Sequence, residues 1–437
     1  MYTLLALLMV AAGPIPAAPA SAVDWRACGT EPRAECATLT VPVDWSRPRA
    51  GTFGLALGRL PATDQAHKLG TLVFGPGGPG DSGVHRVTED ADRFSKEIRA
   101  RFDIVSFDPR GVGGSAPMTC DPALIDAAPD PVLTSQADFD ATVRYNRELW
   151  AGCARRTGPV WDHADTLSTV RDLEALRQAL GERQLTFHGS SYGTLLGQQY
   201  ASEYPGRVRA MVLESVTDHS SRTTTSFLAA QAWAFEDAFD DFLASCPECS
   251  EPWQRLFADP ARGGMTRFDL VAITHKMIKD GGYERLAGLI KSGQGQHVGN
   301  LGVAIPAFCA DWSLPVRSYA DYRRVLSTVS KVAPDTHFPA QTFALTMCLG
   351  WPHVTNPQHD LTVRTERPIL LLNSRHDPAT GLNWARSVER QLGRHGVLVT
   401  YEGTGHGSYS LSDCVKGIAD DYLINLRVPA RGVSCPR

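Results

Sequence analysis

The sequence lacks a block of basic residues, and this absence excludes one broad class of function. Its 43 Lys and Arg residues are outnumbered by 47 Asp and Glu residues, so the formal net charge is 43 − 47, or −4. A protein that binds nucleic acid normally carries a basic patch or stripe. We therefore expect no nucleic-acid partner.

Internal repeats and low-complexity tracts are also absent. The chain has 437 residues, of which 43% are hydrophobic and 21% are charged. This is ordinary usage for a globular protein, so a disordered or collagen-like chain is excluded. The length predicts either two domains or one large domain with an insertion.

Charged side chains are missing from residues 1–22, which contain an apolar run over residues 4–12 and end in Ala20-Ser21-Ala22. This pattern predicts a secretory signal peptide cleaved after Ala22, although its first residues lack the usual Lys or Arg. A membrane anchor is the alternative. No later apolar run is long enough to cross a bilayer, so we expect a secreted protein of 437 − 22, or 415, residues with no membrane partner.

Ten cysteines, all after residue 22, support export. Sequence alone cannot fix their connectivity. One plausible scheme pairs them in sequential order: Cys28 with Cys36, Cys120 with Cys153, Cys246 with Cys249, Cys309 with Cys348, and Cys414 with Cys435. The Cys246–Cys249 spacing also fits redox chemistry or zinc, but no second CxxC and no nearby His pair completes a metal site. A structural disulfide is the favoured interpretation.

Strand-like and helix-like segments alternate along most of the chain. Predicted strands cover residues 38–43, 53–60, 71–74, 103–107, 184–188, 208–213, 368–373 and 397–401, and predicted helices cover 166–180, 194–204, 383–392 and 414–426. Such alternation predicts an α/β fold with a mostly parallel sheet and helices on both faces.

Two long stretches interrupt this alternation. Residues 116–160 form an excursion, and residues 215–367, after the sixth predicted strand, are rich in helical patterns. We expect the second stretch to be a helical cap. The predicted organisation is therefore a signal peptide (1–22), the first part of the core (23–214), the cap (215–367) and the second part of the core (368–437). Phe235, Phe239 and Phe242 share one helical face of the cap, and we expect them to be simple core residues.

The strongest chemical signal is the sequence GSSYG at residues 189–193, which contains G-x-S-x-G with Ser191 at its centre. It follows a predicted strand and opens a predicted helix, the context of a nucleophile elbow. The turn raises the serine hydroxyl above the sheet edge, and the helix N-terminus favours developing negative charge. Ser191 is the predicted nucleophile.

A serine nucleophile needs a base and an acid that orients the base. In this arrangement the chain order is serine, acid, histidine. Asp377 follows the strand 368–373, and His406 follows the strand 397–401, between two glycines. His376 is the competing histidine, but it precedes the acid and would break the order.

A glycine- and proline-rich loop at residues 75–80 follows the strand 71–74. We expect the backbone N–H groups of Gly78 and Tyr192 to stabilise an oxyanion. A phosphate-binding loop is the alternative, but no Gly-Lys-Ser/Thr follows. Arg110, in a second turn after a strand, is expected to tie loops together, with substrate contact as the weaker alternative.

These motifs together resemble the prolyl-aminopeptidase-type branch of the α/β-hydrolases, and especially the secreted tripeptidyl aminopeptidases of actinomycetes. The resemblance rests on residues 76–83 (PGGPGDSG), 108–113 (DPRGVG), 189–193 (GSSYG), 375–378 (RHDP), 405–407 (GHG) and 36–44 (CATLTVPVD), and on Cys414 and Cys435. It spans nearly the whole chain after residue 22 and is weakest in the cap.

The resemblance implies a serine exopeptidase without a cofactor or metal, which releases short peptides, often tripeptides, from a free N-terminus. We expect it to act as a monomer on peptide substrates. Such an enzyme needs an acidic group that binds the α-ammonium, and Glu214, Glu236 and Asp237 are the candidates. Glu214 stands where relatives are expected to carry Asp. Each of the three could equally be a structural or solvated carboxylate.

Three other functions remain open at this stage. An exported esterase would use the same triad without an ammonium pocket. A hydrolase that tailors a peptide or acylated metabolite would also fit. A binding protein on a dead hydrolase scaffold is disfavoured, because all three triad residues are present at the expected places.

Overall fold

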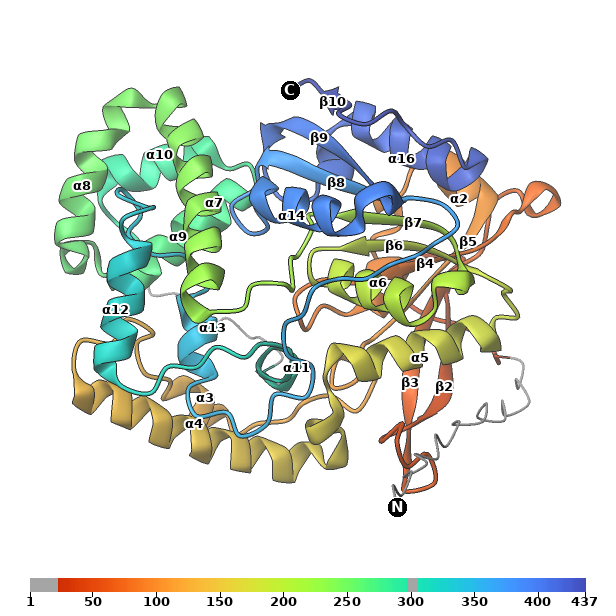
Figure 1. The fold of residues 1–437 in the computed structure, drawn as a ribbon, viewed down its shortest axis with the longest axis horizontal. Coiled ribbons are helices and arrows are strands. Elements are labelled where there is room, and N and C mark those ends of the chain that lie inside the picture. The colour runs from red at the N-terminus through yellow and green to blue at the C-terminus, as the bar shows by residue number, and fades with distance from the viewer. Residues whose placement is uncertain (1–22, 297–304) are drawn as a thin grey trace, which may run out of the picture.

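The computed structural model describes residues 23–296 and 305–437, so the predicted signal peptide lies outside the described residues. One ten-stranded sheet runs through the molecule in the order β1-β2-β3-β5-β4-β6-β7-β8-β9-β10 (Figure 1). Its strands are β1 (Arg26–Ala27), β2 (Glu35–Pro42), β3 (Thr52–Leu60), β4 (Gly70–Gly75), β5 (Phe102–Phe107), β6 (Leu185–Ser190), β7 (Val208–Glu214), β8 (Ile369–His376), β9 (Gly396–Thr404) and β10 (Ser434–Cys435).

From β5 to β10 every neighbouring pair of strands is parallel, whereas β1, β2 and β3 pair antiparallel at one edge. The central strands consist almost entirely of buried residues, as in the segment 369–372 of β8. Continuous burial of this kind is typical of a strand in a sheet whose two faces are both covered by helices. The predicted α/β fold with a mostly parallel sheet is confirmed.

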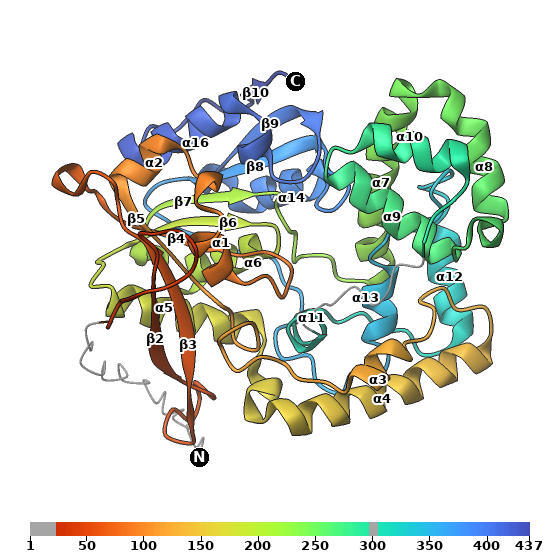
Figure 2. The same ribbon diagram turned by 180° about the vertical axis from the view of Figure 1, so that it is seen from behind.

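Helices cover the two faces of the sheet with separate apolar cores. Leu173 of α5, Tyr200 of α6 and Val388 of α14 pack on one face, and Ile98 of α2 and Tyr422 of α16 pack on the other (Figures 1 and 2). These core helices are α1 (Gly83–Thr88), α2 (Lys96–Arg101), α5 (Thr166–Ala179), α6 (Tyr192–Glu203), α14 (Leu382–Leu392), α15 (Ser408–Leu411) and α16 (Asp413–Asn425).

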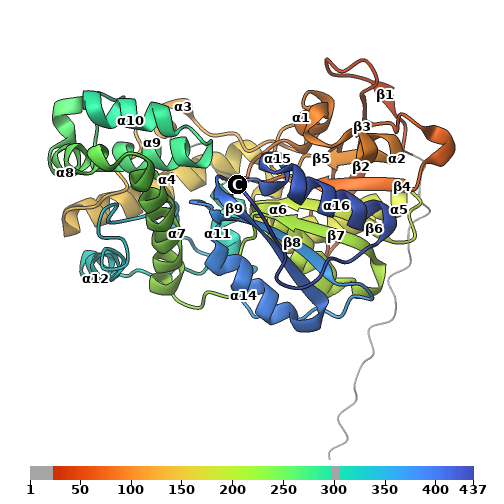
Figure 3. The ribbon, with the colours of Figure 1, turned by 90° about the horizontal axis from the view of Figure 1, so that it is seen from above.

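A second, purely helical layer lies to one side of the sheet (Figure 3). Phe235, Phe239 and Phe242 of α7 are fully buried inside it, so their predicted role in a core is confirmed. Its helices are α3 (Pro122–Asp126), α4 (Gln136–Thr157), α7 (Thr224–Ser245), α8 (Ser250–Ala258), α9 (Arg267–Lys279), α10 (Tyr283–Ser292), α11 (Ile305–Asp311), α12 (Tyr319–Val329) and α13 (Thr342–Met347). No helix in the described part of the chain is long and apolar enough to span a membrane.

The helical layer is larger than the segment 215–367, because α3 and α4 belong to it. Asn146 of α4 donates hydrogen bonds to the carbonyls of Thr346 and Leu349, at 2.8 and 3.1 Å. Tyr322 of α12 donates to the carbonyl of Pro131, at 2.8 Å. The segment 116–160 therefore packs against the predicted cap and forms part of the helical layer. The sequence did not indicate this arrangement.

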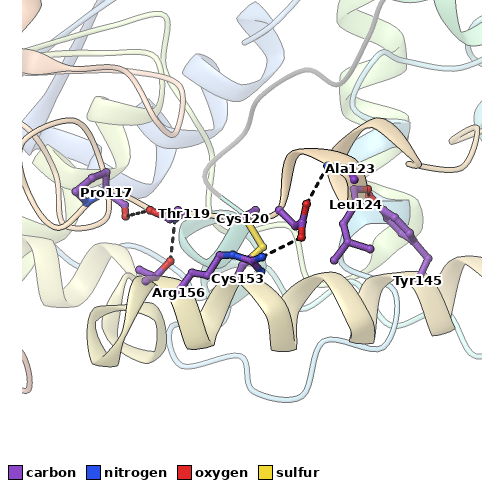
Figure 4. Close-up of a disulfide and its surroundings, with 10 residues drawn as sticks. Pro117, Thr119, Cys120, Ala123, Leu124, Tyr145, Cys153 and Arg156 are labelled. Carbon is purple, nitrogen blue, oxygen red and sulfur yellow. Dashed lines mark hydrogen bonds and ion pairs between the residues drawn. A yellow bond between two sulfur atoms is a disulfide. The ribbon is translucent and has the colours of Figure 1, made fainter.

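A disulfide between Cys120 and Cys153 fixes the start of this excursion against α4 (Figure 4). Arg156 and Asp121 form an ion pair beside it, at 2.9 Å. The other four disulfides join Cys28 to Cys36, Cys246 to Cys249, Cys309 to Cys348, and Cys414 to Cys435. The sequential pairing is confirmed, and the CxxC of residues 246–249 forms a disulfide.

Arg110 has the structural role expected of it. Its buried guanidinium donates two hydrogen bonds to Asp172 of α5, at 2.6 and 2.7 Å, and others to the carbonyls of Val43 and His163. A buried cation with this many partners joins the β2 end, the β5 loop and α5, and it has no free donor to offer a substrate.

Candidate active site

The serine at the centre of the G-x-S-x-G pattern lies in a sharp turn between β6 and α6. Ser191 has φ 56° and ψ −122°, a conformation that a non-glycine residue rarely adopts. Glycines make the turn possible: a Cβ on Gly193 would lie 2.2 Å from the carbonyl oxygen of Gly75, and a Cβ on Gly189 would lie 2.5 Å from that of Gly193. The close approach of the β4 loop to α6 thus requires the glycines on both sides.

Asp377 and His406 come together from neighbouring loops after β8 and β9. The Nδ1 atom of His406 lies 2.9 Å from Oδ2 and 3.0 Å from Oδ1 of Asp377. Asp377 is 1% exposed and also accepts hydrogen bonds from the backbone of Ala379 and Thr380. Burial alone would raise the pKa of Asp377, but the His406 ring and these hydrogen bonds lower it below its usual value.

Thr380 completes the contacts of this pair, and the sequence analysis missed it. Its hydroxyl donates to Oδ2 of Asp377 at 3.0 Å and lies 3.3 Å from Nδ1 of His406. The acid therefore receives donors on both oxygens, which holds its carboxylate in one orientation. A Thr three residues after the acid in the same loop was the available signal.

Ser191 and His406 line one cavity of about 350 Å³, together with Gly78 and Tyr192. This volume is within the range of small-ligand sites. The cavity lies between the core and the helical layer, since α7, α9, α11 and α13 each contribute to its wall. The structure thus brings together the predicted nucleophile, base and oxyanion donors.

The loop that carries Gly78 passes directly over the nucleophile. Gly78 has φ 105°, and a Cβ on Gly77 would lie 3.1 Å from Cβ of Ser191. On the other side, the Tyr192 hydroxyl donates to the buried carboxylate of Asp311 at 2.5 Å. Both backbone segments beside Ser191 are therefore held in place, as preorganised oxyanion donors must be.

Glu214 does not have the free carboxylate that ammonium binding requires. Its side chain is fully buried, forms an ion pair with Arg93, and accepts a hydrogen bond from the backbone N–H of Tyr409 at 3.1 Å. Burial would raise the pKa of Glu214, but the Arg93 charge and the nearby His188 lower it well below its usual range. The structure contradicts the predicted role, because Glu214 lies under the site and its charge is already neutralised.

Glu236 and Asp237 are also engaged elsewhere. Glu236 accepts from the backbone of Asp335 and Thr336, at 2.8 and 3.0 Å, and so closes a loop inside the cap. Asp237 lies 2.8 Å from Nδ1 of His376, an interaction that also removes His376 from the list of candidate bases. Neither carboxylate lines the cavity, so the predicted ammonium role is corrected for both.

The hydrogen bonds to both carboxylate oxygens of Glu236 also decide whether it could bind a metal ion. Glu236, Asp240 and Asp335 place carboxylate oxygens within 4.8 Å of one another. Glu236 already accepts three hydrogen bonds from residues 335 and 336. We therefore interpret the cluster as a carboxylate that fixes this loop.

Asp81 is the only acidic side chain in the cavity wall among the described residues, and the sequence analysis missed it. It lies in the β4 loop and forms a half-exposed ion pair with Arg86 at 3.2 Å. The wall also contains an aromatic cluster in which Phe227, Trp312 and Trp384 are in mutual contact. These residues come from four distant segments, so no local pattern could have revealed them.

Comparisons with known proteins agree with this geometry. Residues 70–252 match the family model described as alpha/beta hydrolase fold, and residues 336–435 match the model described as TAP-like protein. The two matched segments contain Ser191 and the Asp377–His406 pair respectively.

Three curated relatives match almost the whole chain. The tripeptidyl aminopeptidase of Streptomyces lividans is 29% identical over 473 aligned positions, which cover 94% of this chain and 86% of the relative. Serine protease Hip1 of Mycobacterium tuberculosis (strain ATCC 25618 / H37Rv) is 30% identical over 483 positions, covering 94% and 91%. Carboxylesterase B of the same strain is 30% identical over 486 positions, covering 97% and 92%. With this fold and these matches, the chain is a serine hydrolase that belongs to the TAP-like α/β-hydrolase family.

Proposed function

We propose that this serine hydrolase is an exported exopeptidase that releases short peptides, tripeptides foremost, from free N-termini. The five disulfides support export after removal of residues 1–22. Two of the relatives are named as a tripeptidyl aminopeptidase and a serine protease. The substrate is a peptide, and the enzyme acts as a monomer.

One observation carries the proposal: two buried indole rings stand in the wall of the cavity beside Ser191. Trp312 and Trp384, which form this wall, are 2% and 5% exposed. We infer that this wall closes the cavity on the acyl side of Ser191, so that the site selects the end of a peptide chain. The segment that fits between the wall and Ser191 is then the segment released.

In the proposed reaction Ser191 attacks the scissile carbonyl carbon and forms an acyl-enzyme. His406 takes the serine proton and gives it to the leaving amine. The hydrogen bond from Nδ1–H to Asp377 leaves Nε2 free to act as the base, and the carboxylate stabilises the imidazolium that forms. The N–H groups of Gly78 and Tyr192 hold the oxyanion. A water molecule then attacks the acyl carbon while His406 takes its proton. His406 returns that proton to the Ser191 oxygen as the peptide acid leaves.

A panel of chromogenic substrates tests this function. Purified protein is incubated with Ala-Ala-Pro-, Ala-Ala-Ala-, Ala-Pro- and Pro-p-nitroanilide, each with a free and an acetylated N-terminus. We expect cleavage of the free tripeptide anilides and a strong loss of activity on acetylation. Equal cleavage of the free and acetylated forms would contradict an exopeptidase.

An esterase is the second candidate, because one relative is named carboxylesterase B and the cavity wall contains a cluster of aromatic rings. A p-nitrophenyl ester in the same panel separates the two. Ester cleavage without any anilide cleavage would establish the esterase and reject the peptidase.

A further inference from the structure

The wall of the cavity contains buried polar groups that have no partner among the described residues, and these groups lie beside a cluster of aromatic rings. Phe227 and Trp312 have ring centroids 4.7 Å apart, and Trp312 and Trp384 are stacked at 6.4 Å with an interplanar angle of 11°. Gln231 lies one turn after Phe227 in α7, and Gln341 immediately precedes α13, where its side chain makes no capping hydrogen bond. All five residues line the same cavity as Ser191.

Gln231 is 3% exposed, and its side-chain Oε1 has no hydrogen-bond partner in the described part of the chain. The same holds for Oε1 of Gln341 and for the indole Nε1 atoms of Trp312 and Trp384. An unpaired buried polar group costs free energy, so native proteins contain few of them. Four such groups in the wall of one cavity indicate that a ligand satisfies them when the site is filled.

The chemistry of these groups identifies the ligand class. A carboxamide both donates and accepts, and an indole N–H donates. The unpaired groups themselves carry no charge. The charged side chains of the wall are Asp81, which pairs with Arg86, and Lys279, whose backbone carbonyl accepts a hydrogen bond from the N–H of His406 at 3.2 Å and which therefore lies on the His406 side of the cavity. The complementary group is therefore uncharged and has both an N–H and a C=O, which describes a peptide amide.

We propose that Gln231, with Gln341 and Trp384, binds an internal amide of the substrate's acyl part and thereby determines specificity. This inference rests on the proposed exopeptidase function, because only the released N-terminal segment reaches the buried end. A single aminoacyl group has no internal amide. The site therefore selects acyl parts of at least two residues and discriminates against esters at that position.

Depsipeptides test the inference directly. The substrates are free Ala-Ala-Ala-p-nitroanilide and its two analogues in which one internal amide is replaced by an ester. The proteins are the full-length chain and its Gln231→Met and Gln341→Met variants, and Gln254→Met on the exposed face of α8 is the matched control. Labelling with a fluorophosphonate measures the fraction of active enzyme in each preparation.

We expect the unaltered protein to prefer the all-amide substrate over one depsipeptide by about tenfold in kcat/KM, the size of one lost hydrogen bond. Gln231→Met is expected to lower kcat/KM for the all-amide substrate about tenfold and to bring this preference close to one. Gln254→Met is expected to retain the preference.

The inference would be overturned if the unaltered protein cleaved both depsipeptides as fast as the all-amide substrate. An unchanged preference in both glutamine variants would also overturn it. Either result would leave the exopeptidase function intact. If no peptide anilide is cleaved, both the proposed function and the inference fail.

Discussion

The Tyr192 hydroxyl donates a 2.5 Å hydrogen bond to Asp311, and this contact joins the nucleophile turn to the helical layer. Tyr192 directly follows Ser191, whereas Asp311 ends α11 and is fully buried. The same carboxylate accepts from the backbone N–H of Thr166 at 3.0 Å and from Asn356 at 2.8 Å. One buried acid thus connects α5, α6 and the cap beside the active site.

Asp311 predicts a specific pH dependence of stability. Burial, helped by nearby Asp165, raises the pKa of Asp311 to about 7, whereas an unfolded Asp titrates near about 3.9. Between these values the folded state binds more protons than the unfolded state, so the free energy of unfolding falls as pH rises. Asp311→Asn removes the titrating group, and the loss of stability between about pH 5 and about pH 8 should be smaller than in the unaltered protein.

Urea unfolding of both proteins at the two pH values measures this difference. If Asp311→Asn shows the same change in midpoint with pH as the unaltered protein, Asp311 does not carry the proton.

Glu214→Gln tests whether Glu214 is structural. The substitution leaves the largely buried Arg93 without its counter-charge, and we expect unfolding free energy to fall by about 3 kcal/mol. Because the pKa of Glu214 is lowered in the folded state, the stabilisation should be present above the unfolded pKa near about 4.3 and be lost as the pH falls below it.

Glu251→Gln in α8 is the control, since its ion pair with Arg255 is exposed and worth little. Unchanged stability of Glu214→Gln, with a raised KM only for substrates with a free N-terminus, would restore the ammonium role that the geometry denies.

Thr380→Val is predicted to slow catalysis without weakening substrate binding. The hydroxyl donates to Asp377 and lies 3.3 Å from Nδ1 of His406, so its loss acts on the acid and the base. Losing it should lower kcat by about tenfold and change KM by less than about twofold. Steady-state kinetics on a tripeptide anilide measure both constants. Thr380→Ser keeps the hydroxyl and should retain most of kcat; equal losses in Ser and Val variants would refute the positioning role.

The sequence was sufficient to predict where Ser191, Asp377 and His406 lie, because each of them follows a parallel strand. Ser191, Asp377 and His406 sit after β6, β8 and β9, and the carboxyl ends of parallel strands meet at one edge. Each strand is a short apolar run followed by a recognisable motif: GSSYG at 189–193, Asp-Pro at 377–378 and Gly-His-Gly at 405–407. These local patterns were sufficient to place the three residues.

The substrate-binding end could not be predicted in the same way. The charge of Glu214 is neutralised by Arg93, 121 residues earlier, and Glu236 accepts hydrogen bonds from a loop that begins 99 residues later. The cavity wall joins α7, α11, α13 and α14, which meet only through tertiary packing. The spacing of residues along the chain gives no information about such tertiary contacts, so they could not be predicted from the sequence.

Covalent labelling tests the central claim most directly. The unaltered protein, Ser191→Ala and the neighbouring control Ser190→Ala are treated with a fluorophosphonate, and the modified residue is identified by mass spectrometry. The proposed mechanism predicts one label per chain on Ser191, labelling of Ser190→Ala, and none of Ser191→Ala. Labelling of Ser191→Ala at the rate of the unaltered protein, or a label on another residue, would contradict Ser191 as the nucleophile.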